Sequence, residues 1–179
     1  MPRDLIEREI NIPLDSSSII VITGVRRAGK TYVMYQLIKK LMESGIDEER
    51  IFYINFDDER IEPRKDYLTE LIPTIKERYT SSENVYLFLD EIQRIPGWDL
   101  WLNRQYARGV KLFISGSTSQ LKSDKIPRAL RGRTETYTIY PLSFQEFLKF
   151  QKFTEKEIER IRSAEKKAEI LHYLLEYLR

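Results

Sequence analysis

Short apolar runs alternate with amphipathic stretches along the first 143 residues of the chain. Apolar runs occupy 17–24, 50–58, 84–91 and 110–117, and an alternating apolar–polar run follows at 134–143. Continuous apolar runs of this length, bounded by glycine or acidic residues, are typical of strands buried on both faces. We therefore expect five strands in this part of the chain.

The stretches between these runs carry apolar residues at three- and four-residue steps, which indicates helices. The expected helices cover 30–44, 66–80, 97–108 and 123–133. We expect Pro73 to kink or split the second of them. Strands that alternate with helices favour an α/β fold with a mostly parallel sheet covered on both faces.

Strand patterns cease near residue 150, so we expect one domain over 1–150 and the start of a helical region over 151–179. A stripe recurs every third residue across this boundary, at Phe144, Phe147, Phe150 and Phe153. Such a stripe could stack on nucleic-acid bases. A helix that buries one face against the sheet explains it better.

A second apolar stripe runs along the expected C-terminal helix. Its members are Ile158, Ile161, Ala164, Ala168, Leu171, Leu174, Leu175 and Leu178. The stripe is still running where the sequence stops at Arg179, without a glycine stop. We expect the helix to dock on a neighbouring chain, fold back on the core or fray, as the truncated start of a C-terminal region would.

Composition excludes several classes of site. Of 179 residues, 41% are hydrophobic and 32% charged, which suits one domain with a core. The net charge of +2 gives no overall signal for nucleic acid. The absence of cysteine and the single histidine exclude disulfides, thiolate zinc sites and histidine-cluster metal sites. No apolar run reaches the roughly 18 residues that span a bilayer, so we expect a cytoplasmic protein with no membrane partner.

The segment GVRRAGKT, at 24–31, connects the first expected strand to the first expected helix and fits the phosphate-loop pattern G-x-x-x-x-G-K-[ST]. Glycines let backbone N–H groups face a polyphosphate, and the helix presents its positive end. Lys30 is placed to reach the β- and γ-phosphates, and the Thr31 hydroxyl to ligate Mg²⁺. The expected nucleotide-binding residues are Gly24, Val25, Arg26, Arg27, Ala28, Gly29, Lys30, Thr31 and Tyr32. The alternative is an ordinary strand–helix turn.

Arg26 and Arg27 occupy variable positions of this pattern. Their N–H groups are expected on the phosphates. One side chain is expected to reach the γ-phosphate or an acid such as Asp57 or Asp58, while the other is solvated.

The run LFLDE ends the third expected strand in two acids, Asp90 and Glu91. Asp90 is placed to hold Mg²⁺ through its water shell. Glu91 suits a base that orients a water for attack on the γ-phosphate. The alternative is a solvated or capping pair. Because no N-K-x-D guanine-reading motif occurs, ATP and ADP are preferred over guanine nucleotides.

Four segments together resemble the AAA-type ATPases of archaea and bacteria, within the AAA+ class and near the signal-transduction (STAND) ATPases. These segments are ITGVRRAGKT, INFDDER, LFLDEIQRIPGWDLWLNRQYARGVKLFISGSTS and RGRTETYTIYPLSFQEFL, within residues 17–150. The resemblance implies a three-layer α/β/α domain with sheet order 5-1-4-3-2. Members usually continue into a C-terminal domain, often nuclease-like, which these 179 residues do not include.

The resemblance also implies roles by position. Ser117, with Ser115 as the alternative, takes the place of a polar sensor, unless it only caps the next helix. Asn55 takes the place of a residue that restrains the catalytic glutamate, unless it is bonded to backbone. Arg131 or Arg133 takes the place of an arginine finger that reaches a neighbouring subunit, unless both belong to a basic helix end.

These observations predict ATP binding and Mg²⁺-dependent hydrolysis coupled to conformational output, slow in the isolated chain. One alternative is a slow-turnover, STAND-like nucleotide switch. Another is an ATP-driven motor on nucleic acid, for which the sequence shows no dedicated binding element. The expected partners are the nucleotide and either a second copy or a further C-terminal domain.

Overall fold

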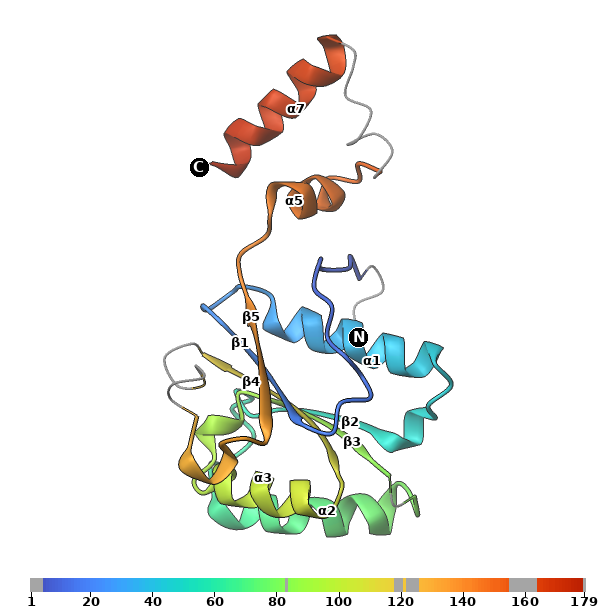
Figure 1. The fold of residues 1–179 in the computed structure, drawn as a ribbon, viewed down its shortest axis with the longest axis vertical. Coiled ribbons are helices and arrows are strands. Elements are labelled where there is room, and N and C mark those ends of the chain that lie inside the picture. The colour runs from blue at the N-terminus through green and yellow to red at the C-terminus, as the bar shows by residue number, and fades with distance from the viewer. Residues whose placement is uncertain (1–4, 83, 118–120, 122–125, 155–163, 179) are drawn as a thin grey trace.

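A parallel five-stranded sheet forms the centre of the computed structural model, which describes residues 5–82, 84–117, 121, 126–154 and 164–178 (Figure 1). The strands are β1 (Ile19–Gly24), β2 (Ile51–Asn55), β3 (Tyr86–Asp90), β4 (Lys111–Ser117) and β5 (Thr134–Ile139). All neighbours pair in parallel, in the order β2-β3-β4-β1-β5. This is the expected order 5-1-4-3-2 read from the other edge, so the sequence-based prediction is confirmed.

Both faces of the sheet are covered by helices. Helix α1 (Lys30–Glu43) lies on one face, and α2 (Lys65–Arg78) and α3 (Trp98–Ala107) lie on the other (Figure 1). Successive residues of a strand point to opposite faces. Ile20 and Ile22 accordingly join the core under α1, whereas Ile19 and Val21 join the core under α2 and α3. The three-layer α/β/α architecture therefore follows from a first strand that is buried at every position.

The remaining elements are short or lie after the sheet. The described residues include three 3₁₀ turns, η1 (Glu48–Arg50), η2 (Ile92–Arg94) and η3 (Arg128–Leu130). After β5 they include two helices, α5 (Phe144–Phe150) and α7 (Ala164–Tyr177). Helix α2 continues through Pro73 and is not split there. Of the helix expected at 123–133, the described part holds only η3, and residues 123–125 lie outside the described residues. No helix of the described residues is both long and apolar enough to cross a membrane.

Three of the four phenylalanines of the stripe pack against α7 and Phe150 is exposed, so the expectation that the stripe faces the sheet is wrong. The rings of Phe144 and Phe147 lie 5.5 and 5.6 Å from the ring of Tyr177, and the Phe153 ring lies 5.3 Å from that of Tyr173. Figure 1 shows α5 and α7 stacked beyond the end of β5, away from the sheet. The reason is that the chain leaves the core at Pro141. The three-residue spacing predicts a helix with an apolar face, but it does not reveal which surface that face packs against.

The C-terminal apolar stripe is also placed differently from expectation. Tyr173 and Tyr177 form the face of α7 against α5, while the leucines of the stripe at 171, 175 and 178 are 56%, 55% and 69% exposed. Ile158 and Ile161 lie outside the described residues. Whether a further chain covers these leucines stays a prediction.

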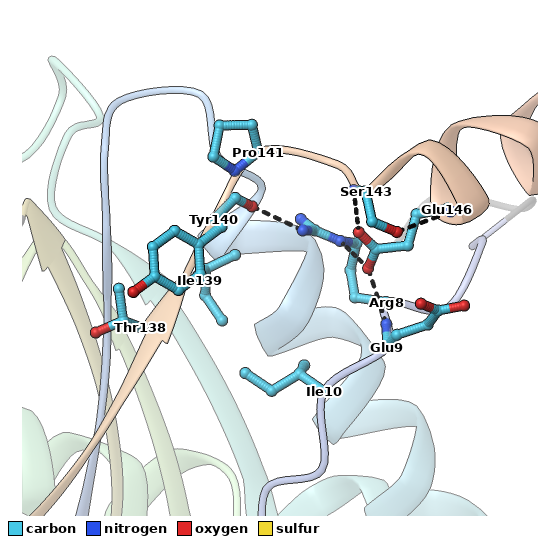
Figure 2. A pocket seen from close by; sticks show the side chains of 9 residues that line it. All are labelled: Arg8, Glu9, Ile10, Thr138, Ile139, Tyr140, Pro141, Ser143 and Glu146. Atoms are coloured by element: carbon cyan, nitrogen blue, oxygen red, sulfur yellow. Dashed lines mark hydrogen bonds and ion pairs between the residues drawn. The ribbon is translucent and has the colours of Figure 1, made fainter. Parts of the chain in front are cut away.

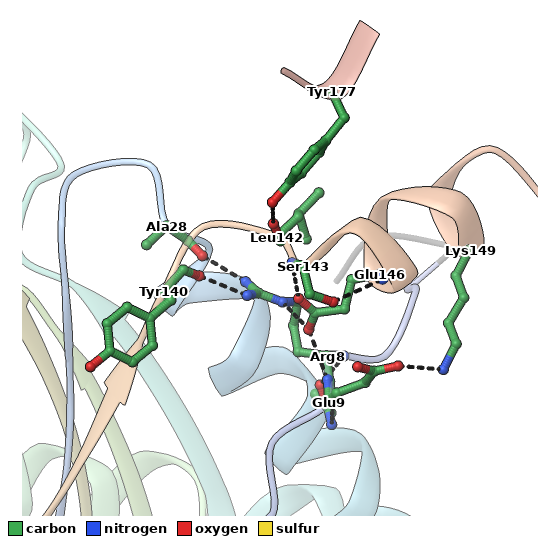
Figure 3. Close-up of polar contacts among 10 residues, drawn as sticks. Arg8, Glu9, Ala28, Tyr140, Leu142, Ser143, Glu146, Lys149 and Tyr177 are labelled. Carbon is green, nitrogen blue, oxygen red and sulfur yellow. Dashed lines mark hydrogen bonds and ion pairs between the residues drawn. The ribbon is translucent and has the colours of Figure 1, made fainter. Parts of the chain in front are cut away.

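A buried arginine ties three segments together behind the loop that follows β1 (Figure 3). The Arg8 guanidinium donates to the Ala28 carbonyl at 2.6 Å, to the Tyr140 carbonyl at 2.8 Å and to Glu146 Oε1 at 2.7 Å. Both side chains of the ion pair are less than a tenth exposed. Glu146 also closes a capping box with Ser143 at the start of α5. The N-terminal segment, the loop and α5 therefore share one salt bridge.

Opposing effects act on the Glu146 carboxyl. Burial raises its pKa, but the hydrogen bonds from Arg8, from the Ser143 N–H and from the Glu9 N–H outweigh burial and lower its pKa overall. A lowered folded-state pKa adds stability that is present above the ordinary glutamate range and is lost as pH falls through the lowered value. The salt bridge is therefore intact at neutral pH.

We predict that Arg8→Ala lowers the free energy of unfolding by about 3 kcal/mol, because it leaves the buried Glu146 carboxylate without its charged partner. The measurement is urea unfolding at pH 7. Lys39→Ala is the matched control, since Lys39 is 45% exposed and its ion pairs with Glu7 and Glu43 are 3.9 and 3.7 Å long. Exposed pairs contribute roughly 0.5 kcal/mol or less. Equal losses in the two variants would show that the buried pair has no special role.

Candidate functional site

The carboxyl ends of the parallel strands meet at one edge of the sheet, where a cavity of about 730 Å³ opens. It is lined by Arg26, Arg27, Gly29, Lys30, Thr31, Tyr32, Asp57, Glu91 and Ser117. These residues come from the loop after β1, the first turn of α1 and the ends of β2, β3 and β4. In open α/β sheets, ligands bind in crevices at the carboxyl ends of the strands.

Both ends of the loop need glycine, because other parts of the protein lie too close to leave room for a side chain. A Cβ at Gly24 would overlap the carbonyl oxygen of Ile139 on β5. Gly29 has φ of +94°, and a Cβ there would lie 2.7 Å from Arg8 Nη1. A side chain at either position would therefore push the loop away from β5 or from the Arg8 salt bridge.

The first turn of α1 faces the cavity with its backbone donors. Gly29 precedes the helix, and within the described part of the chain no side chain caps this end. The amino end of a helix carries partial positive charge and free N–H groups, which favour an anion. Lys30 adds a full positive charge. Its side chain is only 8% exposed, and Nζ lies 3.3 Å from the carbonyl oxygens of Gly24 and Val25 and 3.7 Å from Glu91 Oε1.

The arginines of the loop are exposed and line the cavity. Neither of the acids expected as their partners is available, because Asp57 pairs with Arg94 and Asp58 pairs with Arg60. The acid contact, one of the two alternatives for these side chains, is therefore not observed, and the contact to the γ-phosphate stays a prediction. Arg27 has a left-handed backbone with φ of +65°, which supports the tight turn of the loop.

Asp90 is the buried centre of the site, with 2% of its surface exposed. Its Oδ2 accepts from the Thr31 hydroxyl at 2.6 Å and from the Tyr53 hydroxyl at 2.9 Å. Its Oδ1 accepts from the hydroxyl of Ser115. Three hydroxyl donors from α1, β2 and β4 thus compensate one buried carboxylate.

Tyr53 was not among the residues expected from the sequence. Burial and, after it, the negative charge of Asp90 raise the pKa of the Tyr53 hydroxyl, so Tyr53 stays a neutral donor. The only hint was that Tyr53 lies on a strand expected beside the one that ends in Asp90. In the structure β2 pairs with β3, and Tyr53 lies opposite Phe88, two residues before Asp90. Sequence alone did not specify that pairing in register.

Glu91 follows Asp90 in a left-handed backbone conformation with φ of +54°, rare for a residue other than glycine. Its N–H donates to Ser115 Oγ at 3.3 Å, and its Oε2 accepts from Gln93 Nε2 at 2.6 Å. The Asn55 side chain instead accepts from the Asp57 N–H at 2.9 Å. The expectation that Asn55 restrains Glu91 is therefore wrong here, and the backbone-bonded alternative is the observed one.

The two serines expected as sensor candidates lie at different depths. Ser117, at the end of β4, lines the cavity, whereas Ser115 is fully buried beneath it against Asp90. Strand β4 lies between β1 and β3, as expected for the strand that carries a sensor. Which serine senses the ligand stays a prediction.

Arg131 and Arg133 lie at the opposite edge of the sheet. Both precede β5, which is parallel to β1, and the Ile19 N–H at the start of β1 donates to the Arg133 carbonyl at 2.8 Å. The Arg133 guanidinium is engaged internally with Asn103 and the Ala129 carbonyl, whereas Arg131 is exposed. The six-residue length of β1 separates both from the phosphate loop of their own chain, by about 20 Å.

A second cavity of about 200 Å³ lies beside the Arg8 salt bridge (Figure 2). It is lined by the N-terminal segment and by residues from β5 to α5, namely Arg8, Glu9, Ile10, Thr138, Ile139, Tyr140, Pro141, Ser143 and Glu146. Arg8 lines this cavity and also donates to the Ala28 carbonyl, so it links the wall of the cavity to the loop after β1.

The oxygen atoms of Thr31 and Asp90 suit a hard divalent cation. No group of three or more His, Cys, Asp or Glu side chains that could hold a metal occurs among the described residues. Mg²⁺ does not need one, because it binds through one or two protein oxygens, several waters and the phosphates of its nucleotide. The Thr31 hydroxyl oxygen and Asp90 Oδ2, 2.6 Å apart, are oxygen donors of that kind.

Comparison with known proteins gives the same picture. A family model described as an AAA domain matches residues 16–148. An uncharacterised protein of Methanocaldococcus jannaschii is 41% identical over 176 residues, which cover 98% of this chain and 37% of that protein. An uncharacterised protein of Haemophilus influenzae is 38% identical over 136 residues, covering 75% of this chain and 34% of that protein.

A second uncharacterised protein of Methanocaldococcus jannaschii is 29% identical over 150 residues, covering 81% of this chain and 31% of that protein. The chain thus spans about a third of the length of these relatives. The family match contains the loop after β1, all five strands and the acidic end of β3. This chain belongs to the AAA-type P-loop ATPase family.

Proposed function

We propose that the chain binds ATP with Mg²⁺ in the cavity of about 730 Å³ and hydrolyses it to ADP and phosphate. The observation that carries the proposal is that Lys30, Thr31 and Glu91 line this one cavity at the amino end of α1, while the buried Asp90 accepts a hydrogen bond from Thr31. Its volume suits a ligand of nucleotide size. The loop N–H groups and Lys30 would hold the phosphates.

Thr31 and Asp90 would hold the magnesium ion, Thr31 directly and Asp90 through the ion's water shell. When bound, Mg²⁺ would neutralise charge on the β- and γ-phosphate oxygens. Asp90 Oδ2 accepts from the Thr31 hydroxyl at 2.6 Å, so the two oxygens lie close enough together to serve one ion.

Glu91 would act as general base. Its carboxylate takes a proton from a water molecule whose oxygen forms a bond to the γ-phosphorus. The bond from the γ-phosphorus to the bridging oxygen breaks, and its electron pair leaves with ADP. The proton then passes from Glu91 to solvent, and Ser117 is placed at the cavity wall beside these groups.

The Lys30–Glu91 contact supports this assignment. The distance between Nζ and Oε1 is 3.7 Å, so the two groups of opposite charge attract one another. Phosphate oxygens would compete for Lys30, because a phosphate offers more negative charge than one carboxylate. Glu91 would then be released towards water only when nucleotide is present.

Residues 1–150 would form the ATPase domain, with 151–179 as the start of a helical region that receives its output. Arg8 favours such coupling, because it donates both to the loop carbonyl of Ala28 and to Glu146 of the α5 capping box. The same contacts also suit a slow-turnover nucleotide switch, which is the second candidate. These Arg8 contacts give no support to the third candidate, a motor on nucleic acid.

We predict that Glu91→Gln abolishes ATP hydrolysis but leaves ADP affinity within about threefold of wild type, because the amide cannot accept the proton from water. Lys30→Ala should abolish ATP hydrolysis and also weaken ADP binding. A hydrogen bond to a charged group contributes roughly 1.5–3 kcal/mol, or about ten- to a hundredfold in affinity. The measurements are steady-state phosphate release and isothermal titration with ADP.

Lys40→Ala is the control for a lysine of α1 that lies outside the cavity. Undiminished phosphate release by Glu91→Gln would contradict the proposal. Slow wild-type release that Glu91→Gln leaves unchanged, together with tight nucleotide binding, would favour the switch.

We further predict that hydrolysis per subunit rises with protein concentration, because Arg131 would complete the site of a neighbouring copy. Arg131→Ala should remove that rise and leave the folded protein stable. Arg133→Ala should lower stability instead, since the Arg133 guanidinium bonds Asn103 and the Ala129 carbonyl within its own chain. A wild-type rate per subunit that stays constant on dilution to a demonstrated monomer would contradict a role in trans.

A further inference from the structure

The two carboxylate oxygens of Glu91 have different neighbours. Oε1 faces Lys30 Nζ at 3.7 Å, and Oε2 accepts a hydrogen bond from Gln93 Nε2 at 2.6 Å. The second contact is the shorter, and it comes from a side chain only two residues further along, in η2. One oxygen of the carboxylate is thus bound within η2 while the other faces the phosphate loop.

The carboxamide of Gln93 is held in one orientation by its surroundings. Its Oε1 is buried and has no hydrogen-bond partner among the described residues. A Cβ at Gly116 on β4 would overlap this oxygen, so the carboxamide fits closely over the bare backbone of a glycine. Turning the amide over would place an oxygen against the Glu91 carboxylate. Only the observed orientation donates to Glu91.

A buried acceptor without a partner is unfavourable for stability. The left-handed backbone of Glu91 is a second local cost at the same place. Unfavourable features that coincide beside a reactive group are typical of functional sites.

We propose that Gln93 is the positioning residue for Glu91. This proposal rests on the proposed function. Gln93 keeps Oε2 bound with or without nucleotide. When the phosphates draw Lys30 away, Oε1 is therefore the oxygen left to accept the proton from the attacking water. The carboxylate then turns neither out to solvent nor towards Asp90. Gly116 contributes by leaving room for the carboxamide on β4.

The test is a pair of matched substitutions, Gln93→Met and Gln105→Met. Gln105 is a suitable control because it is also a buried glutamine with an unpartnered Oε1, but it lies on α3, outside the cavity. Each change keeps the length of the side chain and removes its amide. Steady-state ATP hydrolysis, ADP titration and thermal unfolding are measured for both variants, for Glu91→Gln and for wild type.

Gln93→Met is expected to lower kcat roughly 10- to 100-fold, since small misplacements of a catalytic group have effects of this order. KM for ATP and the affinity for ADP should stay within about twofold, and the thermal midpoint should not fall. Gln105→Met should leave kcat unchanged. Gln93→Glu, which puts an acceptor where Glu91 needs a donor, should lose more kcat than Gln93→Met.

An unchanged kcat in Gln93→Met while Glu91→Gln is inactive would overturn the positioning role alone. A loss of ADP affinity or of thermal stability that accounts for the fall in kcat would overturn it too. If Gln93→Met fails to fold, the comparison of Gln93→Glu with wild type decides, and a kcat equal to wild type contradicts the proposal. Full activity in Glu91→Gln would overturn both this inference and the proposed function.

Discussion

One buried carboxylate holds the carboxyl edge of the sheet together. Asp90 accepts hydroxyl donors from α1, β2 and β4, and it lies itself at the end of β3. A charge buried to this extent is tolerated only when its lone pairs are satisfied. The first turn of α1 and three neighbouring strands are therefore fixed relative to one another before any ligand binds. Preorganised donors and acceptors of this kind are what an enzyme needs at a phosphate site.

Beyond Asp90, a series of polar and charged contacts extends across the site. Lys30 faces Glu91, and Gln93 holds the far oxygen of Glu91. On the other side of the loop, Arg8 holds the Ala28 carbonyl and reaches α5 through Glu146. A ligand that withdraws Lys30 would thus act on Glu91 directly, and a shift of the loop would act on α5. Catalysis and conformational output would begin at the same eight-residue loop.

The sequence predicted the parts of the structure that depend on local pattern. The placement of the loop followed from apolar runs and from the spacing of Gly24, Gly29 and Lys30, whereas the strand order was implied by the family resemblance, and that order is confirmed. Contacts between distant segments were not predictable in this way. Arg8 and Glu146 are 138 residues apart, and Tyr53 reaches Asp90 from another strand. The polar contact to Glu91 that was expected from Asn55 comes from Gln93, because side-chain direction at a strand end depends on local backbone that a motif does not specify.

Water attack on the γ-phosphorus is the central claim, and the most direct measurement is isotope incorporation in a single turnover. ATP would be mixed with excess protein and Mg²⁺ in water enriched in ¹⁸O, and the products separated and weighed by mass spectrometry. The account predicts that the released phosphate carries one oxygen from solvent and that ADP carries none. Label in ADP, or ATP that stays bound and intact with no phosphate released, would contradict it.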